Sequence, residues 1–200
     1  MGDVVVTVLV GYLVGSVPAA YLIARLSEGV DVRREGEGNV GARNVFHVVG
    51  PAWGIAAFVA DFAKGAVVAA VFRSEPTWQV ALAGAAVFIG HAYPVWLRFI
   101  GGKGLSTIGG FTAVLMPWAT LIGVGASAVA WVFTHKFLPT TVAGIVATVA
   151  AAPLVGVDWS TVAIVIGLFA LTGVKRALDE DRMREVEAAT GWDRDTGLRA

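Results

Sequence analysis

Residues 4–24 read VVVTVLVGYLVGSVPAAYLIA, a run of 21 residues without a charge. About 20 mostly apolar residues are enough for an α-helix to cross a bilayer. The only charged residue before the run is Asp3, so the run lacks the basic start of a signal peptide. We interpret it as a transmembrane span that is retained. Of the 200 residues, 56% are hydrophobic and 15% are charged, with a mean hydropathy of +0.73. Because soluble domains are about 45–50% apolar and about 25% charged, the sequence predicts an all-α integral membrane protein.

Six further spans are expected, at residues 51–72, 78–97, 104–116, 117–134, 141–157 and 159–174. Pro117 divides an uncharged stretch of 31 residues, 104–134, which would otherwise form one tilted helix. The positive-inside rule decides between one pass and two. With two passes, thirteen of the 15 Lys and Arg residues lie on one side, Arg73 lies opposite and Lys64 lies within a span; with one pass they divide six against eight. The sequence therefore predicts seven transmembrane helices, with a short fourth helix, the N-terminus outside and the C-terminus in the cytoplasm.

A single polytopic membrane domain is expected at residues 1–178, followed by a charged cytoplasmic tail at 179–200, which we interpret as a solvated helix extending from the last span. Fifteen basic and 15 acidic residues cancel, which argues against nucleic-acid binding. The chain has no cysteine, so a disulfide scaffold, a cysteine nucleophile and thiolate metal sites are excluded. No histidine pair has metal-ligand spacing and no Gly-x-Ser-x-Gly motif occurs, so neither a metal nor a protein nucleophile is expected.

The first loop on the basic side reads EGEGNVGARNVFH at residues 35–47. Its three glycines allow positive φ angles and close approach to a ligand, and successive N–H groups in such a loop can form an anion nest. Asn39 and Asn44 add donors, and Arg43 adds a planar fork suited to phosphate. The alternative interpretation is a flexible glycine-rich connection.

A second loop on the same side reads IGGKGLST at residues 100–107. A helix that begins here would offer its free N–H groups and dipole to an anion, and Lys103 would add a point charge. Lys103 could equally be a positive-inside anchor. Two such loops on one face favour an anion site.

Three ionisable residues are expected within the spans. Asp61 and Lys64 lie three residues apart on one helix face, and either they pair with each other or Lys64 contacts a substrate. His91, near the end of the third span, is interpreted first as a hydrogen-bonding group between helices and second as a general base.

Five motifs in order resemble the bacterial acyl-phosphate:glycerol-3-phosphate acyltransferases, the PlsY family: GYLVGSVP at 11–18, GNVGARN at 38–44, DFAKG at 61–65, GHAYPV at 90–95 and GGKG at 101–104. The resemblance implies a multi-pass protein of the bacterial cell membrane whose active site faces the cytoplasm. It implies transfer of an acyl chain from acyl phosphate, and not from acyl-CoA, to the 1-hydroxyl of glycerol 3-phosphate, which gives lysophosphatidic acid for phospholipid synthesis. The bilayer and these two substrates are the implied partners, with no cofactor and no required protein partner.

The resemblance also implies the site. Lys103 is expected to be catalytic, by stabilising charge on the carbonyl and the leaving phosphate. The residues expected to bind substrate are Gly38, Asn39, Gly41, Ala42, Arg43, Asn44, His47, Lys64, His91, Gly101 and Gly102. A substrate phosphate oxygen could accept the proton, so no protein base is required.

Several positions depart from the family pattern. Glu37 replaces a serine, Arg43 a threonine, His47 an arginine and Ile100 a basic residue, and the family's serines before the sixth span and asparagine near Gly173 are not matched. A carboxylate at Glu37 would repel phosphate unless it points away or holds Arg43. Three alternatives therefore stay open: a paralogue that acylates another phosphorylated polyol, a transporter of small anions, and an inactive family member.

Overall fold

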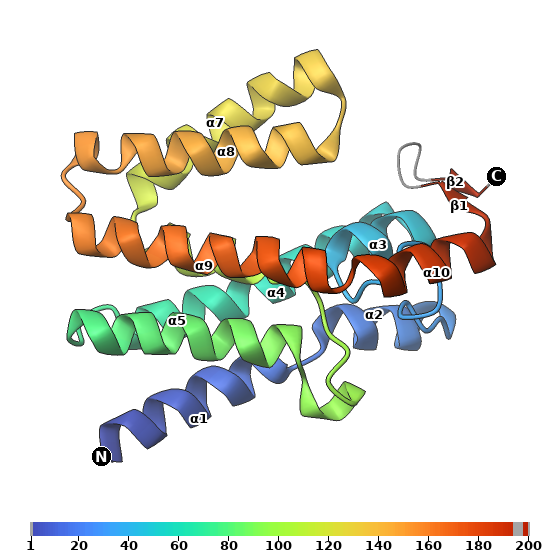
Figure 1. Cartoon of the computed structure of the whole chain (residues 1–200), viewed down its shortest axis with the longest axis horizontal. Coiled ribbons are helices and arrows are strands. Elements are labelled where there is room, and N and C mark those ends of the chain that lie inside the picture. Colours follow the sequence, from blue (N-terminus) through green and yellow to red (C-terminus); the bar gives the residue numbers. More distant parts are fainter. Residues whose placement is uncertain (1, 194–197, 200) are drawn as a thin grey trace.

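The computed structural model describes residues 2–193 and 198–199, and most of the described chain is helical (Figure 1). The elements are, in order, α1 (Gly2–Ser16), α2 (Ala19–Glu28), α3 (Ala42–Val48), α4 (Pro51–Phe72), α5 (Thr77–Ala92), the 3-10 turn η1 (Val95–Leu97), α6 (Leu105–Leu115), α7 (Pro117–Thr134), α8 (Phe137–Ala151), the 3-10 turn η2 (Pro153–Val155), α9 (Trp159–Leu178), α10 (Glu180–Thr190), β1 (Trp192–Asp193) and β2 (Leu198–Arg199). The strands β1 and β2 pair antiparallel. The prediction of an all-α protein is confirmed in its main part, with this short hairpin added.

Five segments among the described residues are long and apolar enough to cross a membrane. They are Gly2–Glu28, α4, Thr77–Leu97, α7 and α9, while α6 and α8 are shorter apolar helices. Their outer faces expose large apolar side chains such as Val71, Val132 and Val174. An apolar exterior of this extent fits an integral membrane protein, whose helices face lipid hydrocarbon, and not a soluble one.

Three boundaries differ from the sequence prediction or refine it. The first apolar run is interrupted at Val17 and Pro18, so that α1 and α2 are separate helices. The uncharged stretch at 104–134 forms two helices that meet at Met116 and Pro117, as the charge count favoured. The helix expected at 141–157 begins at Phe137 and ends at Ala151. Its earlier start is possible because Pro139 lies in the first turn, where a missing N–H breaks no helical hydrogen bond.

The helices pack in pairs at glycine contacts. Helix α1 packs on α5, α4 on α6, and α7 on α8. A Cβ atom at Gly110 of α6 would collide with the backbone oxygen of Phe62 in α4, so only glycine allows this approach. The central apolar cluster joins α4, α5, α6 and α9 through residues such as Val68, Phe111 and Leu168. Figure 1 shows the α7–α8 pair beyond α9, at the edge of the bundle.

The end of the molecule opposite the N-terminus carries α2, α3 and α10 (Figure 1). Helix α10 follows α9 after Asp179 and is part of the predicted tail, of which residues 194–197 and 200 lie outside the described part of the chain. The prediction of a solvated helix holds for its outer face only, since Met183 is fully buried.

Candidate active site

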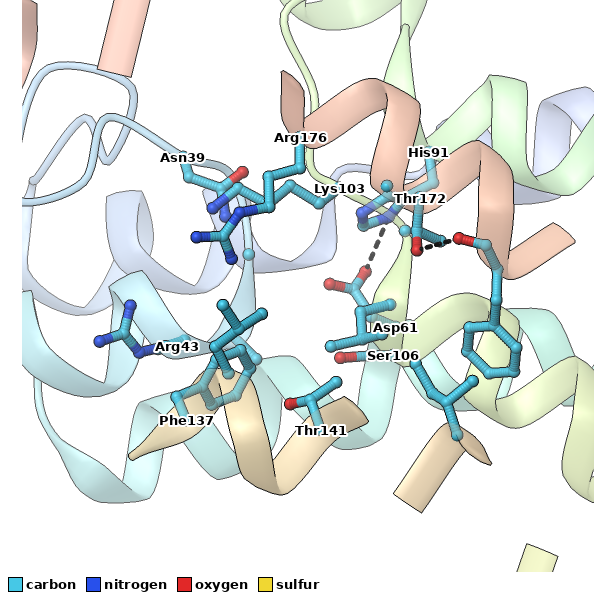
Figure 2. Close-up of a pocket in the computed structure, with 18 of the residues that line it drawn as sticks. Asn39, Arg43, Asp61, His91, Lys103, Ser106, Phe137, Thr141, Thr172 and Arg176 are labelled. Atoms are coloured by element: carbon cyan, nitrogen blue, oxygen red, sulfur yellow. Dashed lines mark hydrogen bonds and ion pairs between the residues drawn. The ribbon is translucent and has the colours of Figure 1, made fainter. Parts of the chain in front are cut away.

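A pocket of about 300 Å³ lies where the loops before α3 and α6 meet α4, α5, α8 and α9. The polar and charged residues of its wall are Glu37, Asn39, Arg43, Asp61, His91, Lys103, Ser106, Thr141, Thr172 and Arg176. Figure 2 shows the guanidinium groups of Arg43 and Arg176 on one side of the pocket and Asp61 with His91 on the other. Three cationic side chains thus face two carboxylates, which leaves the pocket suited to an anion.

Glu37 organises the cationic side of the pocket. Its side chain is almost fully buried and forms an ion pair with Arg43, and its Oε2 lies 3.6 Å from Nζ of Lys103. Arg43 also stacks over Phe137, with its guanidinium carbon 5.0 Å from the ring centroid. Of the alternatives for this departure from the family pattern, the structure selects the one in which Glu37 holds Arg43. The carboxylate thereby connects the two predicted anion-binding loops.

Arg176 is a cation of the wall that sequence reasoning missed. It comes from the last turn of α9 and is partly exposed. No ion pair or hydrogen bond is found for its guanidinium among residues 2–193 and 198–199. Arg43, in contrast, is already paired with Glu37. Arg176 is therefore available to a second anionic group.

Asp61, Lys64 and His91 form a buried cluster at the other side. Asp61 Oδ1 lies 2.8 Å from Nζ of Lys64 and 3.6 Å from Nδ1 of His91. Nδ1 of His91 is also 3.3 Å from Oγ1 of Thr107 in α6, and Lys64 donates to the carbonyl oxygen of Val17 at 3.2 Å. The predicted pair of Asp61 and Lys64 is present, and His91 connects three helices as expected. Asp61 and His91 reach the pocket wall, whereas Lys64 faces a smaller cavity behind them.

The helix N-terminus expected next to Lys103 is present. Helix α6 begins at Leu105, directly after Gly104, whose φ of +83° and close contact with Phe88 fit glycine alone. Within the described part of the chain, no side chain caps this helix, and the N–H groups of a first helical turn have no partner in the helix itself. Ser106, in this turn, lines the pocket beside Lys103. These N–H groups and the hydroxyl offer hydrogen bonds to an anion.

The remaining wall of the pocket is apolar. It includes Leu138, Val142 and Ile145 on one face of α8, and Phe169 on α9. The residues at 138, 142 and 145 follow the three- and four-residue spacing that places side chains on one helix face. A ligand with a charged end and a hydrocarbon end would find a matching surface for each.

The structure brings six of the predicted site residues to this pocket: Asn39, Gly41, Ala42, Arg43, His91 and Lys103. The other six, Gly38, Asn44, His47, Lys64, Gly101 and Gly102, do not line it. Asn44 is fully buried, and its Nδ2 donates to three backbone carbonyls, those of Val32, Glu35 and Asn39, at 2.8–3.0 Å. Its Oδ1 accepts from the N–H of Glu37. Asn44 thus shapes the loop, and a direct contact of these six residues with a ligand stays a prediction.

His47 lies outside the pocket on α3. Partial desolvation and the positive charge of Arg43 lower the pKa of His47, and the charge of Glu37 offsets this only in part. Gly101 and Gly102 lie behind the pocket, where added Cβ atoms would collide with the backbone and ring of His91. Their role in the structure is close packing, which a glycine-rich sequence alone does not distinguish from ligand contact.

Comparison with known proteins gives consistent results. A family model described as glycerol-3-phosphate acyltransferase matches residues 5–180. The chain is 39% identical over 145 residues to glycerol-3-phosphate acyltransferase 5 of Dehalococcoides mccartyi, which covers 72% of this chain and 62% of that protein. It is 43% identical over 153 residues to the glycerol-3-phosphate acyltransferase of Myxococcus xanthus, covering 74% and 76%. A crystal structure of PlsY, an integral membrane glycerol 3-phosphate acyltransferase, in its glycerol 3-phosphate form superimposes with a TM-score of 0.80 at 27% identity, covering 92% of this chain and 93% of that one. The chain spans about three fifths of the length of the Dehalococcoides relative, and most of the length of the other two proteins.

Proposed function

The chain belongs to the glycerol-3-phosphate acyltransferase family, and on that basis we propose that it transfers an acyl chain from acyl phosphate to the 1-hydroxyl of glycerol 3-phosphate. The product is lysophosphatidic acid, the starting lipid of phospholipid synthesis. The donor is an acyl phosphate and not acyl-CoA, and no cofactor takes part.

One observation carries this proposal: the same pocket joins a cationic end to an apolar wall. Arg43, Lys103 and Arg176 can pair with the phosphates of the two substrates, and α8 and α9 provide hydrocarbon contact for the acyl chain. Arg suits phosphate because its planar fork donates two parallel hydrogen bonds. The family's solved neighbour in the glycerol 3-phosphate form supports a site for that substrate in the same fold.

The chemistry needs positioning more than a protein nucleophile. The 1-hydroxyl oxygen attacks the carbonyl carbon of the acyl phosphate, the bond from that carbon to the phosphate oxygen breaks, and phosphate leaves with the electron pair. The hydroxyl proton passes to a phosphate oxygen of a substrate. Lys103 and the first-turn N–H groups of α6 stabilise negative charge on the carbonyl oxygen and the leaving phosphate. Holding both substrates by their phosphates supplies the proximity.

We further propose the arrangement in the membrane. Seven spans, with α1 and α2 counted as one interrupted span, place residues 25–50, 98–103, 135–136 and the tail at 179–200 in the bacterial cytoplasm. The N-terminus lies outside, and the membrane domain comprises residues 1–178. The excess of Lys and Arg on one side supports this orientation. Both substrates would then enter from the cytoplasmic side.

The test is transfer by purified protein in detergent or lipid, with palmitoyl phosphate and glycerol 3-phosphate, scored as lysophosphatidic acid. Palmitoyl-CoA serves as the wrong donor. We expect product from palmitoyl phosphate alone. Product from palmitoyl-CoA at an equal rate would contradict the proposed donor.

Glu37 stands where the family has a serine, and this difference is the reason to consider another acceptor. A folded protein that forms no lysophosphatidic acid, but acylates another phosphorylated polyol, would identify a divergent paralogue. The Glu37→Ser variant separates these cases, because it restores the family's residue. A gain of activity on glycerol 3-phosphate in this variant would indicate that Glu37 alters acceptor choice.

A further inference from the structure

The glycine-rich loop, residues 35–41, contacts α10 at Gly38, and its residues 36–40 are buried. We infer that α10 positions this loop at the pocket, with Arg182 as the positioning residue. The loop supplies Glu37, Asn39 and Gly41 to the pocket wall. The kinetic part of this inference rests on the proposed function, whereas the structural part does not.

The contact centres on Gly38. Nη1 of Arg182 donates to the carbonyl oxygen of Gly38 at 2.6 Å. A Cβ at Gly38 would lie 3.0 Å from Cβ of Val186 in α10, and Gly38 has a φ of +62°. Met183, one turn before Val186, is fully buried. The loop therefore contacts α10 at the residue between Glu37 and Asn39, both of which line the pocket.

Arg182 is itself held by the end of α9. Its Nη2 lies 3.4 Å from Oδ2 of Asp179, and Nζ of Lys175 lies 2.6 and 2.5 Å from the two carboxylate oxygens of Asp179. Nζ of Lys175 also lies 4.7 Å from the ring centroid of Tyr93, at the end of α5. Lys175, Asp179 and Arg182 thus connect α9 to the loop by charged contacts. Arg176, which faces the pocket, lies next to Lys175 in this segment.

The residues that α10 contributes to this contact lie beyond the family match. The match ends at residue 180, whereas Arg182, Met183 and Val186 follow it. A further contact of the same tail places Trp192 with its ring centroid 6.0 Å from that of His47, on α3 directly after the loop. The tail therefore contacts the segment 35–47 both before Arg43 in the sequence, at Gly38, and after it, at His47. On this inference, the contacts of the tail hold in its conformation the segment that carries the departures at Glu37, Arg43 and His47.

The experiment compares Arg182→Ala with Arg184→Ala in the full-length protein in lipid nanodiscs. Arg184 lies on the same helix, and its exposed side chain pairs with Glu180 and with no residue of the loop that the structure describes, which makes it a matched control. Amide hydrogen exchange of residues 36–44 should be faster by about tenfold in Arg182→Ala, because a charged hydrogen bond to the loop is lost, and unchanged in Arg184→Ala. Arg182→Lys, which keeps a donor, should restore part of the protection.

With glycerol 3-phosphate as acceptor, Arg182→Ala should raise its KM by about tenfold while kcat stays within about twofold and the unfolding temperature stays near that of Arg184→Ala. Equal exchange rates at residues 36–44 in the two variants would overturn the inference whatever the activity. A fall in kcat with unchanged KM would also overturn it, since that pattern does not describe a loop that positions a substrate. If the wild-type protein forms no lysophosphatidic acid, the proposed function fails, and the exchange result alone decides the inference.

Discussion

At the scale of single residues, Lys103 is expected to contribute most to the reaction. Lys103 stands between two glycines just before α6, and its Nζ lies 3.6 Å from Oε2 of Glu37. Lys103→Ala should lower kcat by about 10²–10³-fold, because removing one group that stabilises the developing charge has an effect of this size. Lys103→Arg should retain more activity than Lys103→Ala. Transfer assays with both purified variants test this, and a near-wild-type rate in Lys103→Ala would exclude Lys103 from the site.

Arg176 is predicted to bind a substrate phosphate. Arg176→Ala should raise the KM of one phosphate-bearing substrate by about 10–100-fold, the effect of losing a charge-assisted hydrogen bond. Arg73→Ala is the control, because Arg73 is an exposed arginine away from the pocket. Steady-state kinetics with each substrate varied in turn shows which phosphate Arg176 recognises. Unchanged KM values for both would show that its position in the pocket wall has no role in binding.

His47 gives a prediction about pH. Desolvation and the charge of Arg43 disfavour its protonated form, so we expect its pKa to lie below 6.5 in the folded protein. The stability contributed by neutral His47 is then full above about pH 6.5 and decreases as the pH falls below this value, because the unfolded chain binds the proton more readily. NMR titration of labelled histidines, assigned with His47→Gln, measures the pKa. Arg43→Gln should raise it, and a pKa that stays the same would contradict the proposed influence of Arg43.

At the scale of helices, the contact between α4 and α6 provides a matched pair of variants. Gly110 faces the backbone of α4, while a Cβ at the adjacent Gly109 would meet nothing within 4 Å. Gly110→Val should lower the free energy of unfolding by about 1–3 kcal/mol through overpacking, and Gly109→Val should not. Thermal unfolding in detergent compares them. Equal unfolding temperatures would mean that the two helices do not depend on this close approach.

The helices were largely predictable from the sequence where local signals agree. Helix α4 has the predicted bounds of 51–72, since Gly50 precedes it, Pro51 is its first residue, and Arg73 and Glu75 follow it. The start of α8 was misplaced because Pro139 resembles a break, although proline is tolerated in a first helical turn. The interruption at Val17 and Pro18 divides a run that we predicted as one span. Whether a proline bends, ends or begins a helix depends on which neighbouring groups satisfy the backbone, and sequence patterns do not contain those contacts.

At the scale of the whole molecule, the seven-span arrangement can be tested by labelling, because the chain has no cysteine of its own. We expect a cysteine introduced at Glu75 to react with a membrane-impermeant maleimide in intact cells. Cysteines at Lys136 and Arg184 should react only after permeabilisation. If residues 104–134 crossed the membrane once, the cysteines of Lys136→Cys and Arg184→Cys would both react from outside. Labelling of the Lys136→Cys variant in intact cells therefore distinguishes seven spans from six.

The candidate site could be predicted only where its residues form a local sequence pattern. The two glycine-rich loops and Lys103 were recognisable because glycine and basic residues occur together at short spacing. Arg176, Thr141 and the apolar wall of α8 were not, because they reach the pocket only through packing between segments more than 30 residues apart. The docking of α10 on Gly38 joins positions 144 residues apart and was equally invisible. Conversely, the sequence predicts that Asn44 binds a ligand, whereas its Nδ2 donates to backbone carbonyls of the segment at residues 32–39.

The two kinds of pocket wall come from different stretches of the chain. Most of the polar groups lie between residues 37 and 106, while the hydrocarbon surface comes largely from residues 137–145 and Phe169. Mutations can therefore alter the apolar wall while the polar wall keeps its residues, and the reverse. Under the proposed function, a lineage that adapts to cold or heat, and needs shorter or longer acyl chains in its lipids, can substitute residues along α8 while the residues proposed to bind the phosphates stay the same.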